Sequence, residues 1–351
     1  MKKFLGLLLT AVLLLSLAAC GAQDSPAGTQ QTPSNSPSSA PTGGNYVITF
    51  GCTGSEQTSD YAGASAFKEY VEEASNGQIT CNLMFNGVLG SDRETLESVQ
   101  MGSCTVTTTG LTQNTNFVPE LAVLDSPFLF QTAEDVNNLF ADEEFASELS
   151  ALYSNAGFKF VGMTFQGFRT LTSNREVHKM SDMKGMTIRV IEAPTPLALW
   201  SALGANPTPL AFTEVYTALQ QGTVDAQENP LELIYSQKFY EQQDYIISTN
   251  HQIQPIFWVM NLGFYNGLPE DLKKVVDDGF EAGLAASKEY SAQMEATYKQ
   301  TMLDSGCVFL DIDSAAHDEM YTATESVRQS LADQYPAFFD VTISGVERTQ
   351  S

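Results

Sequence analysis

M-K-G-M-T-I-R-V-I-E-A-P, at residues 183–194, opens the stretch of this chain that decides its fold. The stretch continues as L-G-A-N-P-T-P-L-A-F-T-E-V-Y-T-A-L-Q-Q-G from residue 203 and ends as V-D-A-Q-E-N-P at residue 230. The β-branched and apolar run at residues 186–191 is flanked by Gly185 and Pro194, which predicts a short strand. Arg189 lies in this strand, so we expect the strand to deliver a guanidinium group to its end.

A second arginine precedes this stretch. Arg169 lies in G-F-R-T-L-T-S-N-R at residues 167–175, so two guanidinium groups are expected near the ends of adjacent extended segments. An anion that approaches a chain with a formal net charge of −25 is repelled on average, and it needs local positive charge inside a cleft to be held. Arg169 and Arg189 could supply that charge, whereas we interpret the nearby Lys179 and Lys184 as solvated surface residues.

Length and charge limit the function. At 351 residues the chain is long enough for two lobes with their own cores. It has 17 Lys and Arg residues against 42 Asp and Glu residues. Binding to nucleic acid needs a basic face that neutralises phosphates, so this class of partner is excluded.

The first residues predict export from the cytoplasm. Lys2 and Lys3 precede a short apolar run, and residues 17–20 read L-A-A-C. This ending resembles the bacterial lipobox, which implies a signal peptide over residues 1–19, cleavage before Cys20 and diacylglycerol on its sulfur. The alternative is an ordinary signal peptide with a chance cysteine. Residues 20–44 continue with a spacer rich in Ser, Pro and Thr that is expected to be a disordered tether above a membrane.

Strands and helices alternate from residue 45 onward. Residues 46–50 and 78–85 have the pattern of strands, whereas residues 61–74 and 91–101 have the pattern of helices. Ser91 and Glu94 form a capping-box pattern at the start of the second helix. Such alternation predicts an α/β lobe with a mainly parallel sheet. Ligands of these sheets bind beyond the carboxyl ends of the strands. The side chains expected to face a cleft from this lobe are those of residues 53–55, of Asp92 and of residues 108–113, which include Thr53 and Gln113.

A second α/β unit follows, with a helix predicted at residues 193–203. Residues 269–303 form one uninterrupted helical pattern, which at about 1.5 Å per residue would extend for roughly 50 Å and brace both lobes. The predicted fold is therefore α/β, with two lobes, a ligand cleft between them and a long helix that spans both. We assign residues 45–166 and 255–294 to the first lobe, and residues 167–254 and 295–351 to the second.

Several ordered motifs resemble those of one known family. They are G-x-R-x-x-T-S-N-R, M-K-G-x-x-I-R-V, G-A-N-P-T-P-x-A-F-x-E-V-Y-x-A-L-Q, V-D-x-Q-E-N-P and T-N-H, and they are densest over residues 167–251. The chain resembles the extracytoplasmic solute receptors of TRAP (tripartite ATP-independent periplasmic) transporters, the DctP family. The resemblance implies a periplasmic-binding-protein-like fold, a membrane permease as partner, a small carboxylate as ligand, no cofactor and no enzymatic activity.

The same resemblance implies roles for four residues. The arginine that matches Arg189 binds the substrate carboxylate, and the one that matches Arg169 assists it. Asn229, in Q-E-N-P, adds a hydrogen bond, and Phe212 packs over the ligand. The stretch T-T-T-G-L-T-Q at residues 107–113 has no charged residue, unlike its counterpart in sialic-acid-binding members. A smaller monocarboxylate, a dicarboxylate or a sugar acid is therefore expected.

Other functions leave weaker signals. We interpret Glu214 and Glu228 as structural residues that order water or orient an arginine, and His251 as structural too. The run at residues 311–319, D-I-D-S-A-A-H-D-E, lacks the Gly and Glu of a calcium loop, so a strand end followed by one final helix, with Ser314 as its cap, explains it better. No nucleotide, hydrolase or zinc motif occurs. Two rivals remain: an enzyme of the cell envelope, and a binding lipoprotein that signals to a sensor kinase.

The remaining cysteines leave two alternatives open. Cys52, Cys81, Cys104 and Cys307 include no C-x-x-C pair, so a zinc or redox motif is unsupported. One disulfide among the first three is one alternative, and buried free thiols are the other.

Overall fold

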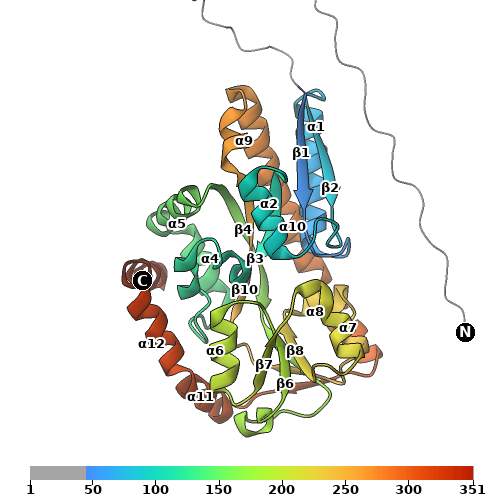
Figure 1. The fold of residues 1–351 in the computed structure, drawn as a ribbon, viewed down its shortest axis with the longest axis vertical. Coiled ribbons are helices and arrows are strands. Elements are labelled where there is room, and N and C mark those ends of the chain that lie inside the picture. Colours follow the sequence, from blue (N-terminus) through green and yellow to red (C-terminus); the bar gives the residue numbers. More distant parts are fainter. Residues whose placement is uncertain (1–44, 351) are drawn as a thin grey trace, which may run out of the picture. The chain divides into compact units, whose positions relative to one another are not determined.

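The computed structural model describes residues 45–350, which form a mixed α/β fold with two β-sheets (Figure 1). The predicted signal peptide, the lipidation of Cys20 and the linker up to residue 44 lie outside the described residues. In Figure 1 the first sheet lies above the second, and helices pack on both sheets. The two-lobed architecture expected from the sequence is confirmed.

The first sheet has the order β2-β1-β3-β10-β4. Its strands are β1 (Tyr46–Gly51), β2 (Ile79–Met84), β3 (Val106–Gly110), β4 (Phe158–Phe168) and β10 (Ile253–Asn261). Strand β1 pairs in parallel with β2 and β3, whereas β10 runs antiparallel to β3 and β4. The expected mainly parallel sheet is thus interrupted, because β10 returns from the second sheet and enters the first from the opposite direction.

The second sheet has the order β11-β9-β5-β8-β6-β7. Its strands are β5 (Thr170–Ser173), β6 (Thr187–Val190), β7 (Asn206–Pro209), β8 (Ala226–Asn229), β9 (Tyr245–Ser248) and β11 (Val308–Asp311). The strand that contains Arg189 is confirmed. The expectation that Arg169 and Arg189 lie on adjacent segments is wrong, because β8 lies between β5 and β6. Asn229, at the end of β8, pairs with Thr170 beside Arg169.

The helices follow the predicted boundaries closely over most of the chain. Those nearest the first sheet are α1 (Ser59–Ala74), α2 (Asp92–Met101), α3 (Leu111–Asn114), α4 (Ala133–Ala141), α5 (Glu143–Asn155) and α9 (Leu262–Gly267). Those that follow second-sheet strands are α6 (Pro194–Ala202), α7 (Val215–Gln220), α8 (Leu231–Ser236) and α11 (Ser314–Ala323). Ser91 and Glu94 form the expected capping box at the start of α2, which positions Asp92 in the first turn.

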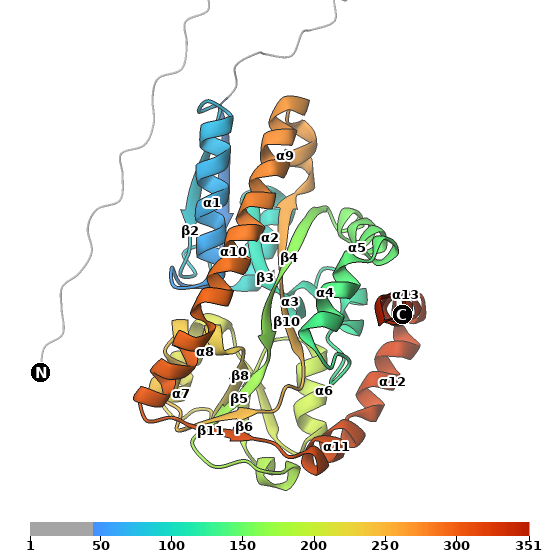
Figure 2. The same ribbon diagram turned by 180° about the vertical axis from the view of Figure 1, so that it is seen from behind.

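The long helix α10 (Glu270–Asp304) has 35 residues, so it extends for roughly 50 Å. Figure 2, which views the molecule from behind, shows α10 in the foreground, running from beside α9 past the first sheet to the level of α8. Leu272 and Phe280 belong to the apolar core that covers the first sheet. Tyr298 and Met302, toward its end, belong to a separate core beside the second sheet. The predicted bracing of both lobes is therefore confirmed.

The C-terminal segment differs from the single final helix that we expected. Three helices occur, because α12 (Glu325–Gln334) and α13 (Pro336–Gln350) follow α11. The side chain of Asp313, and not that of Ser314, caps α11 by accepting a hydrogen bond from the Ala316 N–H at 2.8 Å. The strand end and capped helix that we preferred to a calcium loop are thus present.

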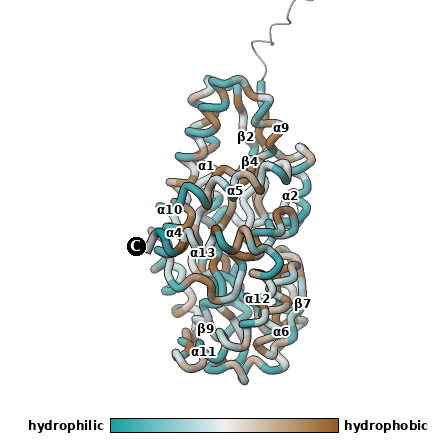
Figure 3. The backbone as a smooth tube through the Cα atoms, turned by 90° about the vertical axis from the view of Figure 1, so that its left-hand side faces the viewer, coloured by the Kyte–Doolittle hydropathy of each residue, from teal (hydrophilic) through white to brown (hydrophobic). Residues whose placement is uncertain are grey.

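The lobe boundaries stay a prediction. In Figure 3, α12 and α13 lead from α11 up to the level of α4. Phe338 of α13 is buried in the same apolar core as Leu139 of α4 and Phe145 of α5. This packing favours placing residues 336–350 with the first lobe, although residues 295–351 were assigned to the second.

Helices α1 and α10 approach each other closely at two glycines. A Cβ atom added at Gly63 would lie 2.7 Å from the carbonyl oxygen of Gly283, which is backbone and cannot rotate away. We therefore expect Gly63→Ala to lower the free energy of unfolding by about 1–3 kcal/mol, as overpacked cores do. Gly267→Ala is the control, since nothing lies within 4 Å of its added Cβ. Equal urea midpoints for the two variants would contradict this account of the helix contact.

Candidate functional site

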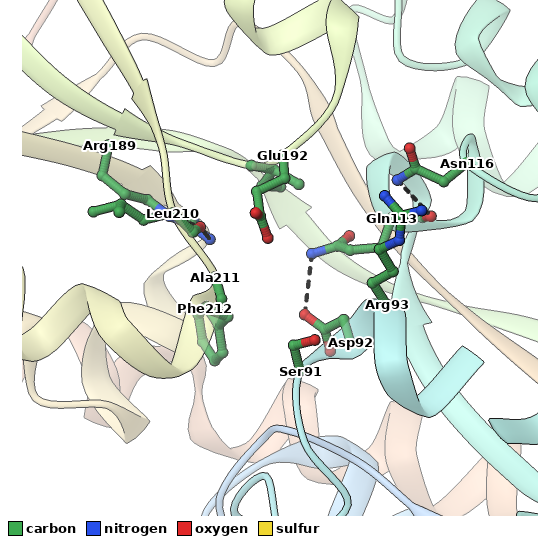
Figure 4. A pocket seen from close by; sticks show the side chains of 11 residues that line it. Ser91, Asp92, Arg93, Gln113, Asn116, Arg189, Glu192, Leu210, Ala211 and Phe212 are labelled. Carbon is green, nitrogen blue, oxygen red and sulfur yellow. Dashed lines mark hydrogen bonds between the residues drawn. The ribbon is translucent and has the colours of Figure 1, made fainter. Parts of the chain in front are cut away.

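One cavity gathers the predicted site residues. It lies between the ends of strands from both sheets, and the space between its walls is about 410 Å³ when the solvent at its mouth is included. Its walls include every residue that the sequence singled out for binding, namely Thr53, Gln113, Arg169, Arg189, Phe212 and Asn229. A second space, called the outer space below, shares wall residues with this cavity. Asp92 and Gln113 line one side of it, and Arg189 and Phe212 line the other (Figure 4). The cavity therefore has one wall from each lobe.

Arg189 is buried, with 1% of its surface exposed, because β6 lies inside the second sheet. Its Nε and Nη2 donate to the carbonyl oxygen of Leu210 at 3.0 and 2.7 Å. Among residues 45–350, Nη1 has no hydrogen-bond partner. Burial lowers the pKa of Arg189 to about 10, so the group stays charged at neutral pH. The backbone contact thus fixes the guanidinium and leaves a charged donor for a ligand.

Arg169 lies at the crossing from β4 to β5 and is equally buried. Its Nε and Nη2 donate to the carboxylate of Glu228, Nη2 also reaches Asn229 Oδ1 at 3.2 Å, and Nη1 donates to Gln254 Oε1. A guanidinium has five N–H donors. These contacts leave one N–H, on Nη1, for a ligand, so Arg169 has less to offer than Arg189.

Glu228 neutralises Arg169. Burial by itself would raise the pKa of Glu228, but the charge of Arg169 and hydrogen bonds from His251 and Arg169 outweigh it and hold this pKa at about 2. His251 Nε2 lies 3.0 Å from Glu228 Oε2, and His251 Nδ1 lies 2.8 Å from Thr249 Oγ1. Burial lowers the pKa of His251, although Glu228 opposes the shift. Both residues therefore orient Arg169, as interpreted from the sequence.

Asn229 and Phe212 complete the wall from the second lobe. Asn229 Nδ2 donates to Gln227 Oε1 at 2.6 Å, and an amide nitrogen carries a second N–H. Phe212 is half-buried and meets Phe239 edge to face, with ring centroids 5.9 Å apart. The phenyl ring is thus anchored on one side and presents an apolar surface to the cavity on the other.

The wall from the first lobe is built around Asp92. Thr53 Oγ1 donates to Asp92 Oδ1 at 2.5 Å, and Gln113 Nε2 donates to Asp92 Oδ2 at 3.3 Å. Burial raises the pKa of Asp92, and these hydrogen bonds together with the charge of Arg189 oppose the shift. Figure 4 shows Asp92 and Gln113 opposite Arg189 and Phe212. The first-lobe wall therefore consists mainly of hydrogen-bond acceptors.

Sequence reasoning missed further residues of these two spaces, among them Asp60, Gln254 and Glu192. Asp60 and Gln254 line the cavity itself, and Glu192 lines the outer space. Asp60 is buried, and its pKa is raised well above the usual range by burial and then by the charge of Glu232. A residue in the first turn of a helix, such as Asp60 in α1, is commonly acidic for local reasons. No pattern therefore marked it as part of a site.

A buried contact joins the two lobes beside the cavity. Glu232 Oε1, from α8, accepts hydrogen bonds from the Ser59 N–H at 2.8 Å and the Ser59 hydroxyl at 2.7 Å, at the start of α1. Gln166 Nε2 donates to the same oxygen at 3.0 Å. Burial raises the pKa of Glu232, and the contacts with Ser59 oppose that shift.

Metal and thiol chemistry find little support in the part of the chain that the structure describes. Within residues 45–350, no group of three or more His, Cys, Asp or Glu side chains could hold a metal ion. Cys52, Cys81, Cys104 and Cys307 are buried free thiols, so the disulfide alternative is wrong. No described helix combines the length and the apolar character needed to cross a membrane.

Comparisons with known proteins agree with the fold and the cavity. Residues 50–334 match the family described as bacterial extracellular solute-binding protein, family 7 (DctP). The 2,3-diketo-L-gulonate-binding periplasmic protein YiaO of Escherichia coli is 30% identical over 259 residues, which cover 73% of this chain and 77% of that protein.

Solved structures extend the comparison. A TRAP periplasmic solute-binding protein of Shewanella oneidensis with bound succinate has a TM-score of 0.82 at 28% identity, covering 86% of this chain and 99% of that one. The sugar acid binding protein DctPAm of Advenella mimigardefordensis, in complex with galactonate, has a TM-score of 0.83 at 25% identity, covering 87% and 99%. With a match over most of its length, a shared two-lobed fold and a cavity between the lobes, this chain belongs to the DctP family of extracytoplasmic solute-binding proteins of TRAP transporters.

Proposed function

We propose that this protein captures a small organic anion through Arg189 and delivers it to a TRAP membrane permease. One observation carries the proposal: Arg189 is buried, charged and fixed by Leu210, yet its Nη1 has no partner among the described residues. A buried donor without a partner costs free energy, which a ligand carboxylate would recover. Two parallel N–H groups of an arginine also match the oxygens of a carboxylate in a way that an ammonium group cannot.

The neighbouring groups support this mode of binding. Asn229 Nδ2 and the last N–H of Arg169 Nη1 line the same cavity and can donate to the same ligand. Phe212 offers an apolar surface for the carbon chain. Arg169 assists Arg189 by donating one hydrogen bond, because Glu228 neutralises most of the charge of Arg169.

Binding would close the two lobes, because a solute that touches both walls stabilises the closed state by its differential affinity. Arg189 belongs to the second lobe, so the carboxylate is captured there first. Thr53 and Gln113 of the first lobe then make contact. The bonds from Ser59 to Glu232 cross between the lobes and add to the stability of the closed form.

Removal of this interlobe contact should favour the open form. Hydrogen bonds to a charged group contribute about 1.5–3 kcal/mol, so Glu232→Ala is expected to weaken ligand binding roughly 10- to 100-fold. Glu232→Gln keeps an acceptor oxygen, so its ligand affinity should lie between that of Glu232→Ala and that of the wild type. Calorimetry measures the affinity, and small-angle scattering measures the radius of gyration with and without ligand. Wild-type affinity and an unchanged radius in both variants would exclude a role for Glu232 in closure.

Export and tethering form the second part of the proposal. Cleavage before Cys20 and lipidation of its sulfur would hold the receptor at the membrane that carries the permease. Mass spectrometry of the mature protein should find diacylglycerol on Cys20, and Cys20→Ser should release the protein from membrane fractions. An unmodified cysteine would contradict the anchor and leave the ligand chemistry untouched.

A thermal-shift screen against organic acids tests the central claim, since a ligand that binds only the folded protein raises its melting temperature. Succinate and galactonate belong in the screen, because structures of relatives hold them. A hit that mass spectrometry recovers unchanged after prolonged incubation separates a receptor from an enzyme. Uptake into vesicles that contain the cognate permease separates a transport receptor from a sensor subunit.

A further inference from the structure

We infer that the ligand is a polyhydroxylated monocarboxylate, such as an aldonic acid, and not a dicarboxylate. This inference rests on the proposed function, because it takes Arg189 as the anchor of one carboxylate and asks what the remainder of the ligand must offer. The answer lies in the side chains that face Arg189 across the cavity (Figure 4).

The charges in the cavity allow one ligand carboxylate. Arg189 provides the positive charge, because that of Arg169 is matched by Glu228. The other ionisable groups in the described walls are mostly acids: Asp60, Asp92 and Glu192. Arg93 also lines the outer space, but its side chain is 63% exposed and bonds to Glu97.

A second carboxylate would therefore meet, among the cations of the described walls, only the exposed Arg93, which already pairs with Glu97. It could approach this wall only against the charge of Asp92 and Glu192, or after those acids had taken up protons. Either course lowers the affinity, because like charges in a desolvated site repel and protonation requires free energy at neutral pH. The wall that disfavours the second carboxylate of a dicarboxylate therefore accepts an uncharged group at that end of a monocarboxylate.

The vacant hydrogen-bonding capacity of the wall points to hydroxyl groups. Gln113 Oε1 is a buried acceptor without a partner among residues 45–350. Asp92 receives one bond at each carboxylate oxygen and has lone pairs left. Acceptors need donors, and each hydroxyl of a ligand brings one O–H. A ligand that offers only acceptors, as a carboxylate does, leaves these atoms unpaired.

The backbone at Gly110 leaves room for this polar wall. A Cβ atom added there would lie 2.7 Å from Gln113 Oε1 and 2.7 Å from Gln254 Nε2. The two amides therefore converge over a glycine at the end of β3, and together they present one free acceptor and one amide donor to the cavity. This pair can bind a hydroxyl group, which both donates and accepts.

Matched pairs of acids test the inference. An aldonate and its aldarate differ only at the last carbon. This carbon belongs to a hydroxymethyl group in the aldonate and to a second carboxylate in the aldarate. We would measure calorimetric affinities for erythronate against meso-tartrate and for galactonate against galactarate, with succinate as a dicarboxylate without hydroxyls. At least one aldonate should bind tenfold or more tightly than its aldarate and than succinate.

Contrary outcomes are distinct from one another. Tighter binding of an aldarate or of succinate would overturn the inference while the receptor function stands. A preference for an unhydroxylated monocarboxylate, such as butanoate, over every aldonate would overturn it in the same way. Failure of every carboxylate to bind would overturn the proposed function itself.

Asp92→Asn tests the wall directly. The variant keeps the shape of the side chain and one acceptor oxygen but removes the charge, so the ratio of aldonate to aldarate affinity should fall at least tenfold. Glu69→Gln is the control. Glu69 is exposed on α1 and does not line the cavity, so its substitution removes the same charge at a distance from the ligand. An unchanged ratio in a folded Asp92→Asn protein would show that Asp92 does not select against the second carboxylate.

Discussion

Arg189→Ala is expected to weaken binding of the carboxylate ligand by about 2–5 kcal/mol, which is a loss of roughly 30-fold to several thousand-fold. Truncation removes the positive charge that binds the ligand. The carboxylate of the ligand would then lie desolvated beside the acids Asp60, Asp92 and Glu192, without a counter-ion. Fold stability should change less, because among residues 45–350 Arg189 hydrogen-bonds only to the carbonyl oxygen of Leu210. Calorimetry on the purified variant measures the effect.

Two further variants make that result specific. Arg189→Lys keeps the charge but loses the planar pair of donors, so it should also bind weakly. Arg175→Ala removes the same charge from an exposed position and should bind as the wild type does. If Arg189→Ala and Arg175→Ala had equal affinities for the ligand, the assignment of Arg189 as the anchor would be wrong.

Glu228→Gln should have the largest effect on stability. It would leave the charge of Arg169 buried without its counter-ion, and breaking a buried ion pair by removing one partner costs about 3–5 kcal/mol. Glutamine keeps one acceptor oxygen, whereas Arg169 and His251 together use both carboxylate oxygens of Glu228. Urea unfolding measures the loss. Glu148→Gln, an exposed change on α5, should leave the midpoint where it is in the wild type.

The same ion pair predicts how this stability depends on pH. The pKa of Glu228 is about 2 in the folded protein, whereas an unfolded glutamate has a pKa near ~4.3. A depressed folded pKa means that the stabilisation is fully present above the unfolded value and is lost as the pH falls toward 2. The difference between wild type and Glu228→Gln should therefore shrink from pH 6 to pH 3. A constant difference over this range would show that the charge of Glu228 is not what stabilises the fold.

Local patterns predicted most of the elements because they depend on neighbours in the chain. The capping box of Ser91 and Glu94, the strand around Arg189 and the start of α10 after Pro269 each need only a few residues in sequence. These local patterns failed in the C-terminal segment, where two adjacent residues could each act as a cap. Asp313, and not Ser314, caps α11, and two further helices follow it.

The partners of the arginines could not be predicted in the same way. Both arginines were recognised as important from their motifs, but the motifs do not say that Glu228 occupies most of the donors of Arg169. Strand β8 had to pair between β5 and β6 before Glu228 and Asn229 could reach the guanidinium. Strand order is set by long-range pairing, which leaves no local trace in a single chain.

By itself, the sequence determined the α/β class, the long bracing helix and the two arginines that a carboxylate receptor needs, because periodicity, caps and motifs are written in adjacent residues. Only the tertiary structure decided which arginine keeps a free donor and which acids face it. It also brought Ser59 against Glu232, which are 173 positions apart in the chain. Burial, desolvation and the meeting of two lobes arise from the whole fold, so the selectivity of the cavity is a property of the folded structure.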